Sequence, residues 1–515
     1  MQNIRLRYAG FVAFFAQMLS VAAGVLFTIM VTRRLSETAF GSWLLISNYA
    51  SYFVFPAAVV GYWVTRYEAR GTPAARTGLV INSVFSFVAV LPYLVLSGLL
   101  SSDTATPYPY FLGMGFFVVL YYPLVVLESV AAATQPESQY KGWIVFEVAK
   151  LVSGFLLLLV WRLELTGAIT ALIVAFALRF VALAALVRRR LGGSFDSALG
   201  RRMIHHSWIP LYGGLASFVG MLDYVAVTFL ASMGTAAMGK EAAIEFSKRV
   251  LGNYGAAYSI GVVVTYSSSL AVAVYPKLLG GGGSRDVEES LRMVSTFAVP
   301  MCIGAIILAR PILGLINPVY VPSYPVVFAL AVAGLLSAIS TPYDSVIMGT
   351  EKVELREEPT FRDFVRSRLF LSPTIVCIGA GLRLLILFVG FLNLRAIAQG
   401  DVLIAAVFWS LSYLFSWIPV AVGRWRLARK ALPTVFPRRS LLNILAACAV
   451  MSAVALLFSG MPVVAQSSAA LAALLPVILA SAGAYFIVLY ALDGWFRSIV
   501  ARVLSFLSSS LGRVP

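Results

Sequence analysis

The sequence has little charge, few cysteines and almost no histidine. Only 12% of its 515 residues are Asp, Glu, Lys or Arg, about half the usual share in a soluble domain. The three cysteines, Cys302, Cys377 and Cys448, fall within apolar runs, so we expect packing residues and no disulfide framework. The two histidines, His205 and His206, are adjacent. They would point to different faces of a helix, which makes them a poor metal pair.

Motifs for nucleotide and metal chemistry are also missing. There is no GxxxxGK[ST] phosphate loop, and the glycine run GGGGS at 280–284 has no lysine to reach a phosphate, so we predict no ATPase. The sequence has no HExxH, no paired CxxC and no arguable Ser/His/Asp arrangement. We therefore expect no metal, no cofactor and no catalytic residue, and we predict that the protein is not an enzyme.

Long apolar runs dominate the chain instead. Hydrophobic residues make up 60% of it, and residues 11–31 read FVAFFAQMLSVAAGVLFTIMV. A run of about 18 or more apolar residues is typical of a helix that crosses a bilayer, whereas a soluble helix would keep a polar face. We predict an all-α polytopic membrane protein with about fourteen transmembrane helices, at residues 8–32, 41–65, 78–100, 110–133, 142–161, 167–187, 207–231, 242–276, 293–316, 325–348, 373–393, 402–423, 440–460 and 467–492.

The distribution of lysine and arginine predicts the orientation. An even number of spans places both termini on one side, and 28 of the 39 Lys and Arg residues lie in segments on that side, with five on the other side and six within spans. Because basic segments stay in the cytoplasm, we predict a multi-pass plasma-membrane protein with both termini cytoplasmic. The net charge of +17 is then a topology signal. It predicts contact with anionic membrane lipids and no nucleic-acid partner.

A membrane enzyme is the alternative that the short outer segments disfavour. Polytopic glycosyltransferases and ligases generally build their catalytic site in a large extracytoplasmic loop. The predicted outer loops are only about seven to eleven residues long, so they offer no room for one.

Ionisable residues within spans are the best pointers to a site, because they are costly in hydrocarbon and tend to face a cavity or a partner. Asp223 stands near the outer end of the seventh span, and Lys248 and Arg249 stand near the start of the eighth. All three would lie roughly 10–12 Å below the outer surface. We predict a cavity where the two cations bind an anionic headgroup and Asp223 serves as an ion-coupling site. A structural ion pair is the alternative.

Further charged residues lie in other spans. Glu128 has no obvious local partner and is a second candidate for ion coupling. Glu147 and Lys150 are three residues apart, which favours a local pair. Arg383 and Arg179 lie near mid-span. Each can line a cavity or pair with a carboxylate on another helix, and we include Arg383 among the predicted substrate-binding residues.

Three polar residues near the N-terminus are weaker candidates for substrate binding. Gln17 and Asn48, in the first and second spans, can bond sugar hydroxyls or make ordinary interhelical hydrogen bonds. Arg66 closes the second span at its inner end. Its guanidinium can bind a phosphate there, or it can simply reach the membrane–water interface and stay solvated.

Four short motifs resemble those of a known transporter family. They are TRRLSETAFGSW at 32–43 after the first span, LDYVAVTFLASMGTAAMGKEAAIEFSKRVLG at 222–252 across the seventh and eighth, YPKLLG at 275–280 and IMGTEK at 347–352. With the span count, they make the chain similar to the multidrug/oligosaccharidyl-lipid/polysaccharide (MOP) flippase superfamily. The nearest resemblance is to its polysaccharide-type, Wzx-like branch of lipid-linked oligosaccharide flippases.

The resemblance implies a V-shaped, MATE-like arrangement of two six-helix bundles. These would be residues 1–203 and 204–436, followed by residues 437–515 with two more helices and an amphipathic cytoplasmic tail. It also implies a monomeric flippase that moves a glycan on a polyprenyl phosphate or pyrophosphate carrier from the cytoplasmic to the outer leaflet by alternating access. A Na⁺ or H⁺ gradient is a possible driving force, and glycosyltransferases or a polymerase are possible functional partners.

An ion-coupled multidrug or metabolite exporter on the same fold is the alternative function. Its cavity should be acidic and aromatic, because its substrates are cations. The predicted spans hold six basic residues (Lys150, Arg179, Lys248, Arg249, Arg310 and Arg383) against four acidic residues well inside spans (Glu128, Glu147, Asp223 and Glu245), which slightly favours an anionic substrate.

Overall fold

The computed structural model of the chain describes most of its residues. The described residues are 19–20, 22–69, 71–205, 207–271, 274, 278, 283–351, 361–394, 397, 399–434, 437–457 and 467–501. Within these ranges the protein is all-helical, with no β-strand.

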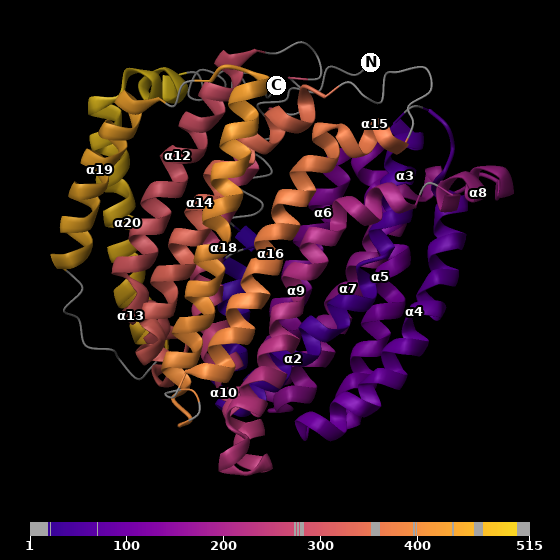
Figure 1. Cartoon of the computed structure of the whole chain (residues 1–515), viewed down its shortest axis with the longest axis horizontal. Helices are drawn as coiled ribbons and strands as arrows, with labels where there is room; N and C mark the ends of the chain where they lie inside the picture. Colours follow the sequence, from indigo (N-terminus) through magenta and orange to yellow (C-terminus); the bar gives the residue numbers. More distant parts are fainter. Residues whose placement is uncertain are drawn as a thin grey trace, which may run out of the picture.

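Long helices run between two opposite ends of the molecule (Figure 1). They are α2 (Glu37–Val54) with α3 (Ala57–Ala69), α4 (Ala75–Thr104), α5 (Tyr108–Thr134), α6 (Pro136–Gly154), α7 (Glu164–Val187), α9 (Trp208–Gly234), α10 (Lys240–Gly261), α12 (Ser284–Ile307), α14 (Tyr324–Gly349), α16 (Arg368–Asn393), α18 (Val402–Ala431), α19 (Arg438–Leu457) and α20 (Ser467–Leu492). The eight-residue helix α13 (Ala309–Ile316) follows α12. Short elements join them: the π-helix η1 (Phe155–Val160), the 3₁₀ helices η2 (Arg188–Arg190), η3 (Ala236–Met238), η4 (Val262–Ala271) and η5 (Pro318–Ser323), and the α-helices α8 (Ser197–His205) and α15 (Phe361–Arg366).

The predicted fold class is confirmed. In the described part of the chain, 11 helices are long and apolar enough to cross a membrane, and α2 with α3 raises the number to 12 as one bent span. These correspond to all the predicted spans except the first and the eighth. Residues 8–18 and 21 of the first lie outside the described residues, which include its helix Ala22–Thr32. The eighth corresponds to α10 followed by η4.

Two predicted spans differ in detail from the structure. The α-helix predicted to continue to 276 ends at Gly261 and becomes the 3₁₀ helix η4. Hydroxyl groups there bond backbone carbonyls three residues earlier, as Thr265 does to Val262 at 2.6 Å, and such bonds compete with α-helical ones. The ninth span begins at Ser284, earlier than predicted, and ends at Ile307.

The second predicted span is bent. Helices α2 and α3 meet at 50°, where Pro56 lacks the N–H that would continue the hydrogen-bond ladder. Helix α2 begins at a side-chain cap, in which the Ser36 hydroxyl accepts a hydrogen bond from the Ala39 N–H at 3.2 Å. The bend directs the two parts of this span against different neighbours: α2 packs on α10, and α3 packs on α4 and α5.

The helices pack as two groups. Helices α3 to α7 mainly contact one another and α2, while α9, α10, α12, α14, α16 and α18 form a second group. Helices α19 and α20 pack on each other and on α12 and α13, at the left of Figure 1. The two groups follow the halves of the chain. The exact boundaries 1–203, 204–436 and 437–515 stay a prediction.

Among the described residues, the buried apolar cluster that both halves share lies toward one end of the molecule. The largest cluster runs through both halves and includes Leu45, Val250 and Ile316. Near α8 a separate cluster, with Leu127 and Leu199, belongs to the N-terminal half alone. A third cluster belongs to the C-terminal half alone. The halves are therefore joined by a common core toward the start of α10, and their cores separate toward the opposite end.

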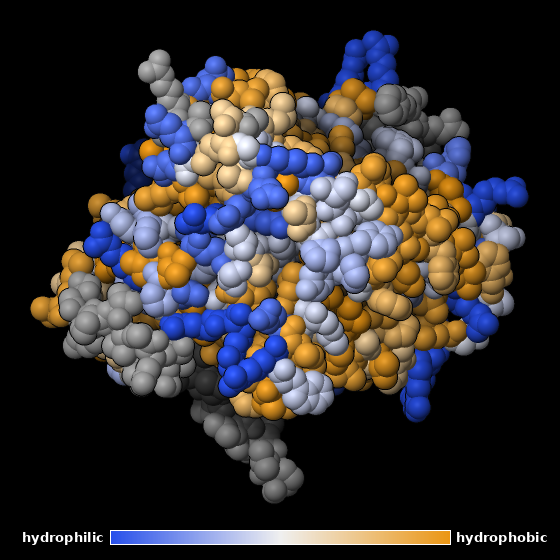
Figure 2. Space-filling model, turned by 90° about the horizontal axis from the view of Figure 1, so that it is seen from below, coloured by the Kyte–Doolittle hydropathy of each residue, from blue (hydrophilic) through white to orange (hydrophobic). Residues whose placement is uncertain are grey.

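The two ends also differ in composition. Helices α8 and α15 lie at one end of the molecule and the start of α10 at the other (Figure 1). The first end is the one that the basic segments predict to be cytoplasmic, so we call it the predicted inner end and the opposite one the predicted outer end. Seen from the predicted outer end, hydrophilic side chains gather near the middle, and a broad hydrophobic area lies to one side (Figure 2).

Candidate functional site

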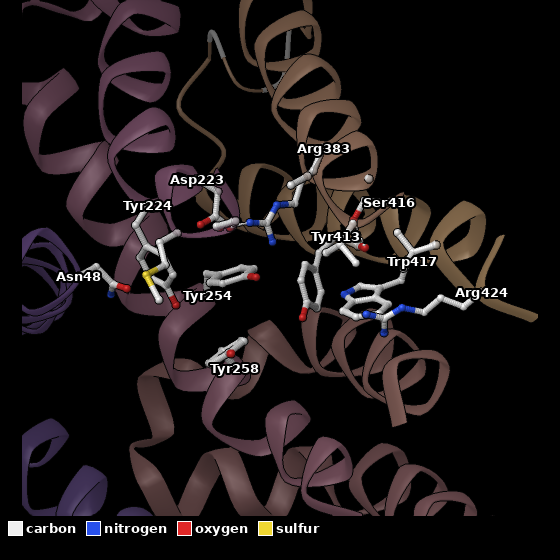
Figure 3. A pocket seen from close by; sticks show the side chains of 16 residues that line it. Asn48, Asp223, Tyr224, Tyr254, Tyr258, Arg383, Tyr413, Ser416, Trp417 and Arg424 are labelled. Carbon is white, nitrogen blue, oxygen red and sulfur yellow. Dashed lines mark hydrogen bonds and ion pairs between the residues drawn. The ribbon is translucent and has the colours of Figure 1, made fainter. Parts of the chain in front are cut away.

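A cavity of about 540 Å³ lies in the C-terminal half. Its walls come from α9, α10, α16 and α18, and Asn48 of α2 contributes from the N-terminal half (Figure 3). Its lining residues are Asn48, Gly220, Met221, Asp223, Tyr224, Tyr254, Tyr258, Val376, Gly379, Ala380, Arg383, Tyr413, Ser416, Trp417, Val420 and Arg424. Because the lining includes Asn48 of the N-terminal half, movement of one half against the other would change access to the cavity.

A buried ion pair lies on one wall of the cavity. The guanidinium of Arg383 on α16 lies 3.3 Å from the Asp223 carboxylate on α9, and also donates to the Gly220 carbonyl. The indole N–H of Trp409 on α18 donates to the same carboxylate at 3.0 Å. Asp223 and Arg383 are 2% and 6% exposed. Breaking such a pair would leave an uncompensated charge in surroundings of low dielectric constant. The ion pair and the Trp409 hydrogen bond therefore hold α9, α16 and α18 in place relative to one another.

This geometry corrects the predicted partner of Asp223. The sequence placed Lys248 and Arg249 at its depth on the next helix, but the structure pairs Asp223 with Arg383. The alternative prediction for Arg383, a carboxylate on another helix, is confirmed. Residues at equal depth on two consecutive helices need not pair. The Asp223 side chain faces α16 and α18, and not the cations of the next helix.

Aromatic side chains form much of the remaining wall. Tyr254 stacks on Trp409, with ring centroids 3.6 Å apart and planes 9° apart. Tyr413 lies under the Arg383 guanidinium at 5.0 Å, and Tyr258 and Trp417 also line the space (Figure 3). Such a wall offers flat apolar faces with phenol and indole groups at their edges, which suits sugar rings as well as organic cations.

A second arginine lies at the far side of the cavity from Asn48 (Figure 3). The guanidinium of Arg424 on α18 lies 3.4 Å from Asp344 of α14 and 3.3 Å from the Ser340 hydroxyl. Asp344 also accepts a hydrogen bond from Ser372. The sequence analysis missed Arg424 because it ended this span at 423, whereas α18 continues to Ala431. A predicted span that continued past residue 423 would have included Arg424.

The arrangement suits binding of a ligand. Two arginines, each held by a carboxylate, flank an aromatic space. The described residues contain no group of three or more His, Cys, Asp or Glu side chains that could hold a metal ion. A ligand with a negative charge and rings would satisfy both features of the wall.

Lys248 and Arg249 lie outside this cavity, where the halves meet at the predicted outer end. The Arg249 guanidinium lies 2.8 Å from the Glu37 carboxylate of α2, and the Lys248 ammonium lies 3.4 Å from the Ala105 carbonyl. A Cβ atom at Gly41 would overlap the Lys248 carbonyl oxygen, so α2 and α10 approach closely only because this position is glycine. Binding of substrate by these cations stays a prediction.

Replacing Gly41 with valine should open this contact. The added side chain would push α2 from the Lys248 backbone, so amides of residues 37–45 and 245–252 should exchange faster in hydrogen-exchange mass spectrometry. Gly98→Val on α4 is the matched control, because a Cβ atom there meets nothing within 4 Å. Equal exchange in both variants would show that the close approach does not hold this end together.

The other predicted substrate residues fall in different places. Asn48 lines the cavity and donates to the Leu44 carbonyl of its own helix at 2.9 Å. Arg66 lies outside the cavity, with its guanidinium 2.5 Å from the Tyr62 hydroxyl. Gln17 lies outside the described residues. Asp223, Arg383 and Asn48 are thus the predicted residues that the structure brings together.

Glu128, the second ion-coupling candidate, lies in the N-terminal half. Its carboxylate is 2.6 Å from the Arg179 guanidinium of α7, so the partner that the sequence did not show is on another helix. Glu147 and Lys150 form the predicted local pair, at 2.5 Å.

Comparison with known proteins identifies the fold. No protein-family model matches the chain, and no curated protein matches it. Among solved structures, the lipid II flippase MurJ in its inward closed conformation is similar with a TM-score of 0.58, at 13% identity over 95% of this chain and 99% of that one. The eukaryotic MATE transporter AtDTX14 is similar with a TM-score of 0.56, at 14% identity over 83% and 97%.

A multidrug resistance MATE family transporter of the MOP superfamily, in its inward-facing conformation, is similar with a TM-score of 0.51, at 10% identity over 81% and 96%. At these identities the likeness establishes the fold. The chain is a multi-pass membrane protein whose fold is similar to those of the flippase MurJ and of MATE transporters.

Proposed function

We propose that the protein is a flippase that moves a lipid-linked oligosaccharide between the leaflets of the plasma membrane. The observation that carries this proposal is the cavity with Arg383 and Arg424 on an aromatic wall. An anionic headgroup carrying sugars matches both features, and a polyprenyl phosphate or pyrophosphate glycan has both.

The arginines can receive a phosphate without leaving a buried charge unpaired. Arg424 is 3.4 Å from Asp344, and the Asp344 side chain is 31% exposed, so its carboxylate can be solvated when a phosphate takes its place. Guanidinium binds phosphate through two parallel hydrogen bonds, which makes arginine well suited to this exchange. Arg383, paired with the buried Asp223, would act as the fixed second charge.

The aromatic wall supports recognition of the glycan. Tyr413 and Trp417 line the space beside both arginines (Figure 3). Sugar rings have apolar faces that pack on aromatic rings, and their hydroxyl groups can bond phenol oxygens, the indole N–H and the Asn48 amide. The lipid tail would remain in the bilayer, so the cavity need hold only the headgroup.

The packing of the halves supports alternating access. The halves share one core toward the start of α10 and have separate cores toward α8. If α8 lies on the cytoplasmic side, as the arginine distribution predicts, the cavity in this conformation would be reached from the inner leaflet. Loss of the α2–α10 contact would then open it to the outer leaflet.

A multidrug or metabolite exporter is the second candidate. The aromatic lining and Asp223 favour it, because organic cations bind aromatic faces and carboxylates. The Asp223 charge is already balanced by Arg383. Arg424 adds a further cation to the lining, and its partner Asp344 is 31% exposed and is not among the lining residues. The balance of charge therefore favours an anion.

The cellular setting is part of the same proposal. Both termini would lie in the cytoplasm, the protein would act as a monomer, and a Na⁺ or H⁺ gradient would drive transport. Glycosyltransferases or a polymerase would supply or consume the glycan on either side of the membrane.

Transport in proteoliposomes tests the proposal. A fluorescent glycolipid with a pyrophosphate linkage should become accessible to an outside quencher faster with the protein than without it. A glycolipid with a neutral linkage and the same sugars is the control, and we expect little movement of it. Movement of an organic cation, with none of either glycolipid, would establish the exporter instead.

A further inference from the structure

A ten-residue 3₁₀ helix continues one wall of the cavity toward the predicted inner end. Helix η4 (Val262–Ala271) follows α10 directly, and Tyr254 and Tyr258 of α10 line the cavity just before it. Runs of 3₁₀ helix longer than three or four residues are uncommon, because their hydrogen-bond geometry is poorer than that of an α-helix, and such a stretch within a longer helix often marks a hinge. None of the ten residues of η4 is among those that line the cavity.

The sequence of η4 gives little preference for the α-helical form. Its first eight residues read VVVTYSSS, and β-branched residues, tyrosine and serine are all weaker α-helix formers than alanine or leucine. Three hydroxyl groups bond the carbonyl three residues earlier, as Ser267 does to Val264 at 2.7 Å and Ser269 does to Tyr266 at 2.5 Å. The segment therefore loses little when it leaves the α-helical form, and the two forms are close in free energy.

The junction between α10 and η4 is packed tightly against α14. A Cβ atom at Gly261 would lie 2.6 Å from the Leu330 Cβ atom, and one at Gly334 would lie 3.2 Å from the Gly261 carbonyl oxygen. Such a close approach of two backbones holds the end of α10 in place. A change in the form of η4 would therefore act on the chain that follows the junction and not on α10.

Conversion of η4 into an α-helix would shorten and turn that chain. The rise per residue would fall from about 2.0 Å to 1.5 Å, and the turn per residue from about 120° to 100°, so ten residues would shorten by about 5 Å and turn by about 200°. Val274 and Leu278 follow η4 and are buried in an apolar cluster with Tyr343 of α14 and Ala428 of α18. The conversion would remove them from this cluster.

The cluster lies next to the second arginine of the cavity. Tyr343 directly precedes Asp344, and Ala428 is about one helical turn after Arg424. The charged atoms of Arg424 and Asp344 are 3.4 Å apart. While η4 is a 3₁₀ helix, the chain after it supports the parts of α14 and α18 that hold this ion pair. Loss of that support would loosen the pair and leave the guanidinium available to a ligand.

We propose that η4 is a conformational switch for the Arg424–Asp344 ion pair. Its 3₁₀ form holds the pair together, and its conversion to an α-helix releases the pair when an anionic ligand binds the arginine. The role in ligand binding rests on the proposed function, whereas the conversion and its link to the ion pair do not. Because such a link is reciprocal, a change that breaks the pair should also favour the α-helical form.

Selective labelling for solid-state NMR tests the conversion without any substrate. The dipeptide Tyr–Ser occurs twice in the chain, at Tyr258–Ser259 in α10 and at Tyr266–Ser267 in η4. With ¹³C-carbonyl tyrosine and ¹⁵N serine in lipid bilayers, these two dipeptides alone give a carbonyl–nitrogen correlation. Wild type should show one signal at an α-helical shift and one away from it, and Ser259→Ala assigns both by removing the first. Two α-helical signals in wild type would overturn the proposal.

Breaking the ion pair tests the link from the side of the cavity. Asp344→Asn should move the Tyr266 signal toward the α-helical position, because the 3₁₀ form then no longer gains from holding the pair. Ser340→Ala is the matched control, since it removes a neutral partner of Arg424 and leaves the ion pair in place. The Tyr266 signal should move less in this control than in Asp344→Asn. An unmoved Tyr266 signal in Asp344→Asn would contradict the link.

Strong helix formers within η4 test the link from the other side. Thr265→Ala/Ser269→Ala should favour the α-helical form roughly five-fold, so the amides of residues 340–347 and 424–431 should exchange faster in hydrogen-exchange mass spectrometry. Ser259→Ala is the control, because its hydroxyl bonds the Ala256 carbonyl in the same way within α10, and it should exchange as wild type does. A Tyr266 signal that moves without faster exchange would show that η4 does not act on the pair.

Ligand binding separates the switch from the proposed function. Titration with a short-chain pyrophosphate glycolipid should move the Tyr266 signal of wild type toward the α-helical position, and Thr265→Ala/Ser269→Ala should bind this glycolipid up to about five-fold more tightly. If the glycolipid binds and the Tyr266 signal stays in place, the function stands and the switch is wrong. If no glycolipid binds while the signal still follows the ion pair in Asp344→Asn, the function fails and the switch stands.

Discussion

Replacing Arg383 with methionine should abolish transport and destabilise the protein by about 3–5 kcal/mol, the usual effect of removing one partner from a buried ion pair. The side chain of Asp223 is 3% exposed, so its charge would have no water to compensate for the loss. Trp409 would still donate its N–H, but one neutral donor does not balance a buried carboxylate. Thermal unfolding of the purified protein measures the stability, and the glycolipid assay measures transport.

A double variant separates stability from function at this site. Arg383→Met with Asp223→Asn removes both charges, so most of the lost stability should return, because neutral replacements of a buried pair are often tolerated. Transport should stay lost, since the fixed positive charge is missing. If Arg383→Met transported glycolipid at the wild-type rate, the ion pair would be a structural brace and not part of the substrate site.

Replacing Arg424 with glutamine should weaken binding of an anionic headgroup about 10- to 100-fold, which corresponds to loss of a charge-assisted hydrogen bond of roughly 1.5–3 kcal/mol. The Arg424 side chain is 13% exposed, so solvent screens this interaction little. Binding can be measured by titrating a short-chain pyrophosphate glycolipid into the protein in detergent and following intrinsic fluorescence, because Trp417 lines the same space.

Asp344→Asn is the matched variant for this prediction. It frees Arg424 from its carboxylate, so an anionic glycolipid should bind more tightly than to wild type. An organic cation should show the reverse order, weaker with Asp344→Asn and stronger with Arg424→Gln. Tighter binding of the cation to Arg424→Gln, with no effect on the glycolipid, would support the exporter over the flippase.

The membrane fold follows closely from the sequence because apolar runs report burial in lipid without knowledge of any partner. Pro56 even lies at the bend of the second span. The 3₁₀ geometry of η4 could not be predicted, since it depends on hydroxyl groups such as Thr265 choosing a backbone carbonyl over other partners. The periodicity of apolar residues in the sequence does not indicate which carbonyl a hydroxyl group bonds.

The site was predicted less completely than the fold. Asp223 and Arg383 were recognised separately as costly charges, but their pairing joins α9 to α16 across 160 positions of sequence, and only the packing reveals it. Lys248 was expected to lie at the same depth as Asp223 on the next helix, yet its ammonium lies near the Ala105 carbonyl and its backbone contacts Gly41 of α2. Local spacing gives the depth of a residue in the membrane but not the helix that it faces.

Photocrosslinking of the headgroup tests the central claim, that the C-terminal cavity holds the substrate glycan. A photoreactive phenylalanine analogue would replace Tyr413 in the cavity, and in a control Phe388 of α16, which is 54% exposed on the outside of the bundle. With a pyrophosphate glycolipid labelled in its sugars, crosslinking at position 413 should saturate as the lipid is increased and be competed by unlabelled glycolipid. Crosslinking at 388 should only rise in proportion to the lipid. Saturable crosslinking at 388 and none at 413 would contradict the account.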